Sequence, residues 1–251
     1  QPAFRWLATT TRACSAILEG RLSEADKFVH DALRYGKLAG RDDEAWIVFG
    51  EQFFEVCRLR GHLAQTMAVA RGIEKIPNGL HALVFGYLVD GGAVDDARAH
   101  FLGEMENGLP VRRGPGELAL LNSYAYCAAR LGELDRAEEL YERLLPHAEQ
   151  LALSTIIWPA SGYYLGLLAD AMGRPDDAIA HHRQAAVLHE RIGAPLLLAR
   201  SRIALGSLVG EPEATELLTE AYEDSIACGA HGLAAMAQAT LDARPVRGQP
   251  R

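Results

Sequence analysis

Three histidines within one helical pattern are the first candidates for chemistry in this chain. His181, His182 and His189 lie in one stretch, and the spacing of His182 and His189 puts both on one face of a helix. A zinc site needs a third and a fourth ligand with supporting hydrogen bonds, and the sequence offers no such set. We therefore expect no metal, and we interpret His182 as a packing residue where neighbouring repeats carry an apolar side chain.

The sequence lacks the short motifs of common catalytic machinery. It contains no phosphate loop of the type Gly-x-x-x-x-Gly-Lys-Ser/Thr and no Gly-x-Gly-x-x-Gly that follows a strand. Gly-x-Ser-x-Gly and His-Glu-x-x-His are absent as well. We expect a protein that is not an enzyme, needs no cofactor and binds other molecules through a surface.

A recurring turn provides the framework for these side chains. In each copy a glycine ends one helical pattern and a small residue opens the next. The six turns cover residues 20–25, 61–66, 92–97, 132–137, 173–178 and 210–214. Their glycines are 41, 31, 40, 41 and 37 residues apart. A period of this length predicts stacked helical hairpins, each packed on its neighbours.

The residues after each glycine explain how a hairpin would form. Glycine ends a helix in the left-handed conformation at little steric cost, and carboxylates such as Asp95 and Asp135 then favour the first turn of the next helix. Apolar residues follow at the i, i+3, i+4, i+7 spacing of one buried helix face. We predict that the small residues Ala137 and Ala178 are buried where paired helices cross.

Composition supports an all-α fold. Hydrophobic residues make up 49% of the 251 residues, and no long alternating pattern indicates a strand. We expect a right-handed superhelix of about six helical hairpins, similar to a tetratricopeptide solenoid, with no sheet. The formal charge of −8 disfavours direct contact with nucleic acid, which needs a basic face.

The chain divides into hairpins that together form one domain over residues 1–243. We expect the hairpins at 3–39, 42–76, 79–107, 117–152, 155–192 and 195–229, with a capping helix at 230–243. Prolines and glycines concentrate at 107–116, which would be a hinge, and residues 244–251 would form a disordered tail. Pro146 should stop or kink the helix that contains it.

Four dispersed cysteines and the absence of a long apolar run describe the expected environment. Cys14, Cys57, Cys127 and Cys228 form no Cys-x-x-Cys pair, which is typical of core residues in a reducing compartment. No stretch is apolar enough to span a bilayer, and the first residues show no signal-peptide pattern. We expect a piece of a longer cytoplasmic protein.

The inner surface of the solenoid is the candidate binding site. In a right-handed solenoid the first helix of each hairpin lines the concave face, and alignment by the turn glycines selects polar and aromatic side chains for it. These residues are Glu51, Glu55, Arg58, Asn122, Tyr126, Arg130, Tyr163, Asp170 and Arg200. Such a groove suits a protein or peptide partner or a small polar effector. Because carboxylates alternate with arginines, we expect a zwitterionic or mixed-charge ligand; a merely solvated inner face is the alternative.

Aromatic residues are concentrated in the first helices of two hairpins. Trp46, Phe49, Phe53 and Phe54 share one predicted helix, and Trp158, Tyr163 and Tyr164 share another. Because aromatic side chains fill the space between stacked hairpins, we expect most of them in the core.

Two stretches resemble a family of large signalling ATPases. Leu165-Gly166, Gly173 and Ala178 have the spacing of a tetratricopeptide repeat, although the repeats are longer and lack its terminal proline. The segments 137–148 and 164–178, the latter continuing through 189–194, resemble phrases of actinobacterial-type multidomain AAA/STAND regulators. Those proteins carry an ATPase followed by a tetratricopeptide-like region, with a LuxR-type DNA-binding domain or a class III nucleotidyl cyclase domain.

The resemblance implies a sensor or regulatory arm that controls an ATPase switch. We expect a non-catalytic module of a cytoplasmic transcriptional regulator that binds a small effector or a protein partner. The alternative is a scaffold or oligomerisation region of a nucleotidyl cyclase–ATPase protein, which would form a homodimer. The catalytic and DNA-binding residues of the family have no counterpart in this sequence.

Overall fold

In a computed structural model of the chain, residues 1–67, 82–106, 108 and 116–244 are described. They form a mainly helical protein, as predicted, but one short antiparallel pair of strands corrects the expectation that the fold contains no sheet. The α-helices of these residues are α1 (Pro2–Leu18), α2 (Leu22–Leu38), α3 (Asp42–Arg60), α5 (Ala82–Asp90), α6 (Val94–Met105), α7 (Glu117–Leu131), α8 (Ala137–Leu144), α9 (Ser161–Ala171), α10 (Pro175–Arg191), α11 (Pro195–Leu208), α12 (Glu213–Ala227) and α13 (His231–Asp242).

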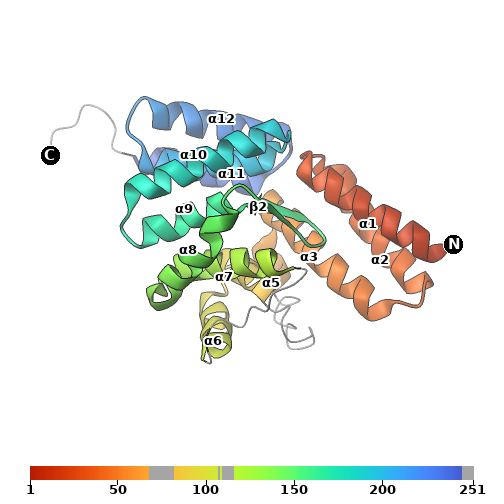
Figure 1. The fold of residues 1–251 in the computed structure, drawn as a ribbon. Helices are drawn as coiled ribbons and strands as arrows, with labels where there is room; N and C mark the ends of the chain where they lie inside the picture. Colours follow the sequence, from red (N-terminus) through yellow and green to blue (C-terminus); the bar gives the residue numbers. More distant parts are fainter. Residues whose placement is uncertain (68–81, 107, 109–115, 245–251) are drawn as a thin grey trace.

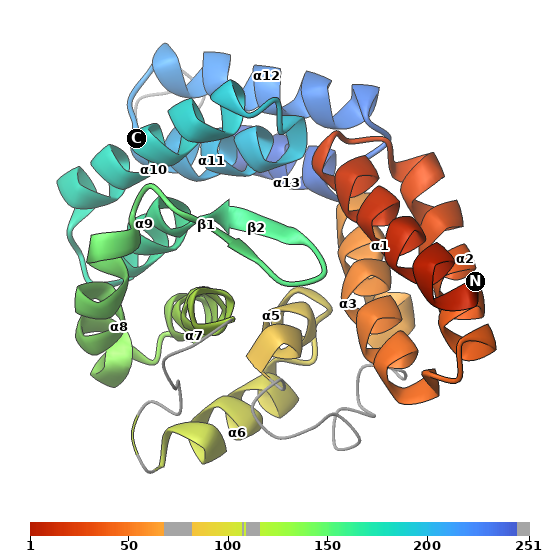
Figure 2. The ribbon, with the colours of Figure 1, turned by 45° about the vertical axis from the view of Figure 1, so that its right-hand side comes forward.

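Consecutive helices pack as pairs, and the pairs follow one another around a ring (Figure 1). Figure 2 looks into this ring and shows α3, α5, α7 and α9 on its inside, with α6, α8, α10 and α12 outside. The first helices of most pairs therefore face the centre. The partner expected for α3 falls at 68–81, outside the described residues.

The repeated turn has the predicted geometry at five of its six positions. The left-handed glycines are Gly20, Gly61, Gly92, Gly132 and Gly173. Gly210 is the exception: its φ is not positive. The small residues that follow are fully buried at Ala25, Ala97, Ala137, Ala178 and Ala214. The prediction that Ala137 and Ala178 lie in the packed crossings is therefore confirmed.

The ring closes because its last helix returns to the first repeats. Helix α13 packs against both α3 and α11. The backbone of Gly232 approaches that of Gly61 so closely that a Cβ on Gly232 would lie 2.5 Å from the Gly61 amide nitrogen. Gly20 of the first turn similarly faces Cys228 at the end of α12. Residues far apart in sequence thus share one interface.

The two strands, β1 (Leu151–Leu153) and β2 (Ile157–Ala160), form a hairpin inside the ring (Figure 2). This corrects the expectation that Trp158 belongs to a helix with Tyr163 and Tyr164. The β-branched run 155–157 disfavours a helix, and Pro159 pushes Trp158 into an extended conformation. Helix α9 begins only at Ser161.

Several boundary predictions have clear outcomes. Helix α8 stops before Pro146, which lies in a 3-10 turn (Leu145–His147), as predicted. The proposed hinge at 107–116 lies almost wholly outside the described residues, as do residues 245–251 of the proposed tail. Arg244, where that tail was expected to begin, instead donates hydrogen bonds to the carbonyls of Gly206 and Val209.

The cysteines and the helix lengths complete the description. Cys57 and Cys127 are buried, Cys14 and Cys228 are partly buried, and all four are free thiols. Within the described part of the chain, no helix combines the length and apolar character needed to cross a membrane.

Candidate functional site

The inner-face residues selected from the sequence meet at the centre of the ring, but most are buried. Exposure is at most 9% for five of them, namely Glu51, Glu55, Asn122, Tyr163 and Arg200. Arg58 and Tyr126 are partly buried, whereas Arg130 and Asp170 are exposed. The interior is therefore not the open groove that we expected, because the β-hairpin and a cluster of paired polar groups fill much of it.

Glu55 is the centre of this polar cluster. Its carboxylate accepts hydrogen bonds from Arg58, from Arg200 at 2.7 Å and from the Tyr87 hydroxyl at 3.2 Å. Burial by itself would raise the pKa of Glu55, but the charges of Arg200 and Arg58 outweigh this effect and lower the pKa. Glu55 is thus an ionised anchor that joins α3 to α5 and α11.

Asp90 at the end of α5 extends the cluster. It lies 3.4 Å from Arg58 and accepts a hydrogen bond from the Tyr126 hydroxyl of α7. Arg130, one turn after Tyr126, interacts with the Tyr126 side chain and has a favourable electrostatic interaction with the Asp90 carboxylate. No ion pair joins Arg130 to a carboxylate within the described residues. The guanidinium of Arg130 therefore retains hydrogen-bonding capacity.

A cavity of about 350 Å³ opens beside this cluster, where the ring closes. Its polar lining consists of Arg58, Asp90, Tyr126, Arg130, Tyr163 and Arg200. Its apolar lining includes Leu59, Leu63, Val89, Leu233 and Met236. The volume falls at the lower end of the range for small-molecule pockets, roughly 300–1,000 Å³. A second space of about 10 Å³ shares Arg58, Tyr126 and Tyr163 as lining, so packing closes the interior next to the cavity.

The β-hairpin is held inside the ring by Glu51 and Gln52 of α3. The Glu51 carboxylate accepts hydrogen bonds from Ser154 and from the amide and hydroxyl of Thr155, the last at 2.6 Å. The Gln52 amide donates to the Thr155 carbonyl at 2.8 Å. Burial raises the pKa of Glu51, although these hydrogen bonds partly offset the effect. Glu51 is therefore a structural anchor for the hairpin, outside the cavity lining.

Asn122 and His189 position the start of α9. The Asn122 side-chain oxygen accepts from the Ser161 hydroxyl at 3.0 Å. The Ala160 amide donates to Nε2 of His189 at 2.9 Å, so Nδ1 carries the proton and donates to the Ser201 hydroxyl, 3.0 Å away. Burial, followed by the nearby Arg200 charge, lowers the pKa of His189 to about 4.

His182 packs in the core as the sequence indicated. It is 1% exposed, it lies against Gly166, and its ring centroid is 5.6 Å from that of Tyr163. Burial and then His181 lower its pKa to about 4. The described residues contain no group of three His, Cys, Asp or Glu side chains placed to hold a metal ion.

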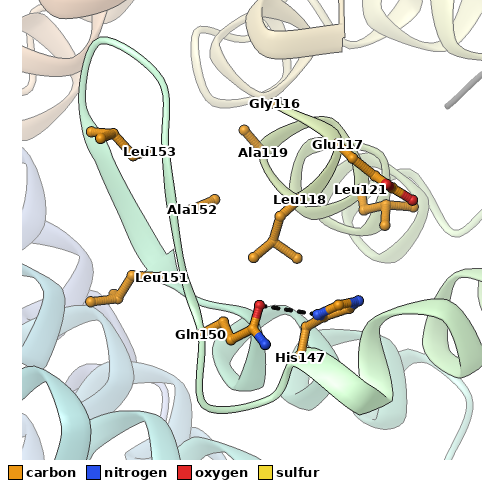
Figure 3. A pocket seen from close by; sticks show the side chains of 10 residues that line it. All are labelled: Gly116, Glu117, Leu118, Ala119, Leu121, His147, Gln150, Leu151, Ala152 and Leu153. Carbon is orange, nitrogen blue, oxygen red and sulfur yellow. Dashed lines mark hydrogen bonds between the residues drawn. The ribbon is translucent and has the colours of Figure 1, made fainter. Parts of the chain in front are cut away.

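A separate hollow of about 250 Å³ lies between the start of α7 and strand β1 (Figure 3). Figure 3 shows Leu118 extending from α7 towards the pair formed by His147 and Gln150, which share a hydrogen bond of 3.1 Å. Glu117 at its edge is paired with Arg143. Because the polar groups around it are already paired, this hollow is a weaker candidate than the cavity at the ring closure.

Sequence reasoning missed Asp90 and the α13 wall of the cavity. Asp90 lies two residues before the turn glycine Gly92, just as Arg130 lies two residues before Gly132. The same alignment could therefore have selected it. Leu233 and Met236 carried no signal, because only closure of the ring brings α13 to the other elements. Asp170 is exposed and does not line the cavity.

Searches with this chain against protein-family models, curated proteins and solved structures returned no match.

Proposed function

We propose that this chain is a non-catalytic ligand-binding module whose site is the cavity at the ring closure. The observation that carries the proposal is the convergence of Arg58, Arg130 and Arg200 from three helices on a single cavity with an apolar wall. A pocket with a few convergent polar groups on an apolar lining is what small-ligand recognition needs. A small effector, or the end of a peptide, fits this space better than a folded protein surface.

The proposal includes a regulatory role in a larger cytoplasmic protein. The resemblance of segments 137–148 and 164–178 to AAA/STAND regulators supports a sensor arm attached to an ATPase, in a LuxR-type transcriptional regulator or a cyclase homologue. The repeated glycine turn and the buried alanines support a right-handed, tetratricopeptide-like superhelix. In this proposal a ligand signals its presence by bridging the second hairpin and the capping helix, because the cavity is lined by both α3 and α13.

The test is a screen with a variant that fills the cavity. A library of metabolites and short peptides is screened by thermal shift on the wild-type chain, and each hit is repeated on Met236→Trp. Met236 is 49% exposed, so the larger ring can occupy the cavity mouth without entering the core. Ala239→Trp is the matched control, since Ala239 is exposed on the same helix and does not line the cavity.

We expect hits to stabilise the wild type and Ala239→Trp but not Met236→Trp. In the longer protein, Met236→Trp should also abolish the response to the same compound. Hits that stabilise all three chains equally would place binding elsewhere and contradict the proposal.

A further inference from the structure

The charges around the cavity at the ring closure define the class of its ligand. Arg58, Arg130 and Arg200 contribute three positive charges to the wall, and Asp90 contributes one negative charge. Glu55 lies behind Arg58 and Arg200 and pairs with both. Three guanidinium groups against two carboxylates leave one positive charge, although the whole chain has a formal charge of −8.

The two carboxylates are already occupied. Glu55 accepts hydrogen bonds from Arg58, Arg200 and Tyr87. Asp90 is engaged by Arg58 and by the Tyr126 hydroxyl. A ligand ammonium group would have to compete with these buried partners, so the cavity offers little to the positive half of a zwitterion.

The hydrogen-bond donors of the arginines, in contrast, are not all paired. Arg130 is exposed and forms no ion pair within the described residues. Nε of Arg58 is buried with no acceptor in the part of the chain that the structure describes. An arginine fork matches a carboxylate in geometry as well as charge.

The rest of the cavity lining is mainly apolar. It includes Leu59, Leu63 and Val89, together with Leu233 and Met236 of α13. An acyl chain or ring there would be removed from water, which contributes about 25 cal/mol for each Å² of apolar surface buried. The same ligand would touch α3, α5 and α13.

From these observations we infer that the cavity binds a small amphipathic monoanion, a carboxylate carried on an apolar body, with Arg130 as its principal charge partner. The inference rests on the proposed function and names the ligand class of its site. One excess positive charge matches a carboxylate better than a doubly charged phosphate. Because the ligand contacts both α3 and α13, its binding also stabilises the closed ring.

The experiment compares octanoate, octanol and octylammonium, which share a chain length and differ in charge, by calorimetric titration at low ionic strength. We expect octanoate to bind the wild type at least about tenfold more tightly than either other probe, as a charge-assisted contact requires. Arg130→Gln should reduce octanoate affinity to that of octanol. Arg34→Gln is the control with the same charge change, because Arg34 is exposed on α2, outside the cavity lining.

Each other outcome overturns the inference in a distinguishable way. Equal binding of octanol and octanoate, or an unchanged octanoate affinity in Arg130→Gln, would show that the anion is not recognised and would leave the cavity as the binding site. Preference for octylammonium would reverse the ligand class. Failure of all three probes to bind would overturn the inference, and the screen with Met236→Trp would separately decide whether the proposed function survives.

Discussion

Gly61 and Gly232 bring the end of α3 and the start of α13 into direct backbone contact. A Cβ on Gly232 would lie 2.5 Å from both the Gly61 amide nitrogen and the Arg58 carbonyl oxygen. Real Cβ atoms do not approach backbone so closely, so only glycine permits this crossing. The contact forms one side of the cavity, because Arg58, Gly61 and Gly232 are all among its lining. The same contact therefore closes the ring and forms one side of the cavity.

The first prediction is that Gly232→Ala destabilises the protein and opens the cavity. Alanine favours a helix over glycine by about 1 kcal/mol, but here α13 must move away from α3, and overpacking of this kind typically costs roughly 1–3 kcal/mol. Urea unfolding measures the net change in the free energy of unfolding. Gly103→Ala in α6 is the control, since its Cβ would meet nothing within 4 Å, and it should stabilise. A Gly232→Ala chain that is more stable than the wild type would refute the crossing.

The second prediction concerns the small residues after the turns. Ala178→Leu should cost on the order of 1–3 kcal/mol because Ala178 is fully buried between packed helices. Ala137→Leu should behave in the same way. Ala180→Leu lies on the same helix at an exposed position and should change the free energy of unfolding by less than about 0.5 kcal/mol. Equal melting of Ala178→Leu and Ala180→Leu would show that the crossing tolerates a larger side chain.

The repeated parts of the fold were predictable from sequence, and the departures from repetition were not. The turn glycine and the buried alanine recur because most pairs of helices need a left-handed residue at the turn and a small side chain where the two helices pack closely. The hairpin at 151–160 occurs once, and its anchor Glu51 is about a hundred residues away. Its one local signal, a β-branched run followed by Pro159, disfavours a helix but does not identify a hairpin.

The candidate site was predicted in part, for a related reason. Alignment by turn glycines assigned Arg58, Arg130 and Arg200 to one face, because positions three, two and ten residues before the turn glycine lie on the same side of a helix. The alignment could not show that the carboxylates of Glu55 and Asp90 would already be paired with arginine and tyrosine side chains of the same chain. Nor could it show that α13 would cover the face, since a contact between the second hairpin and the capping helix depends on the curvature of all the repeats between them.

The third prediction is that stability falls between pH 7 and pH 5. Burial lowers the pKa of His182 and His189 to about 4 from an unfolded value of 6.5. The unfolded chain therefore takes up protons below pH 6.5 while the folded chain does not, so stability is present above this range and is lost as the pH falls. Each histidine contributes about 2 kcal/mol to the loss between pH 7 and pH 5, which urea titrations at several pH values can measure.

The variant His182→Leu distinguishes the contribution of His182 to the pH dependence of stability from that of His189. Nδ1 of His182 is buried without a hydrogen-bond partner among the described residues, so an apolar replacement should be neutral or stabilise by about 1 kcal/mol at pH 7. It should also reduce the dependence on pH. His62→Leu, at an exposed position, should leave that dependence as in the wild type. An unaltered pH profile in His182→Leu would mean that His182 takes up its proton in the folded state.

The fourth prediction tests how the β-hairpin is held. Thr155→Val keeps the shape of the side chain but removes the hydroxyl that donates to Glu51, and a buried acceptor left short of a partner costs roughly 1–3 kcal/mol. Amide hydrogen exchange across 151–160 should accelerate. Thr215→Val is the control, because its hydroxyl bonds Glu211 on the surface. Unchanged exchange in Thr155→Val would show that the Glu51 contact does not hold the hairpin.

The central claim, that ligand binds in the cavity closed by α13, is tested most directly by the methyl spectrum of the four methionines during titration with octanoate. Met236 lines the cavity, whereas Met105 and Met172 do not and serve as internal controls. We predict a saturable shift of the Met236 methyl resonance in the wild type, with Met105 and Met172 unmoved. In Arg130→Gln the same shift should require at least about tenfold more octanoate. A Met236 resonance that stays in place, or a larger shift at Met105 or Met172, would contradict the account.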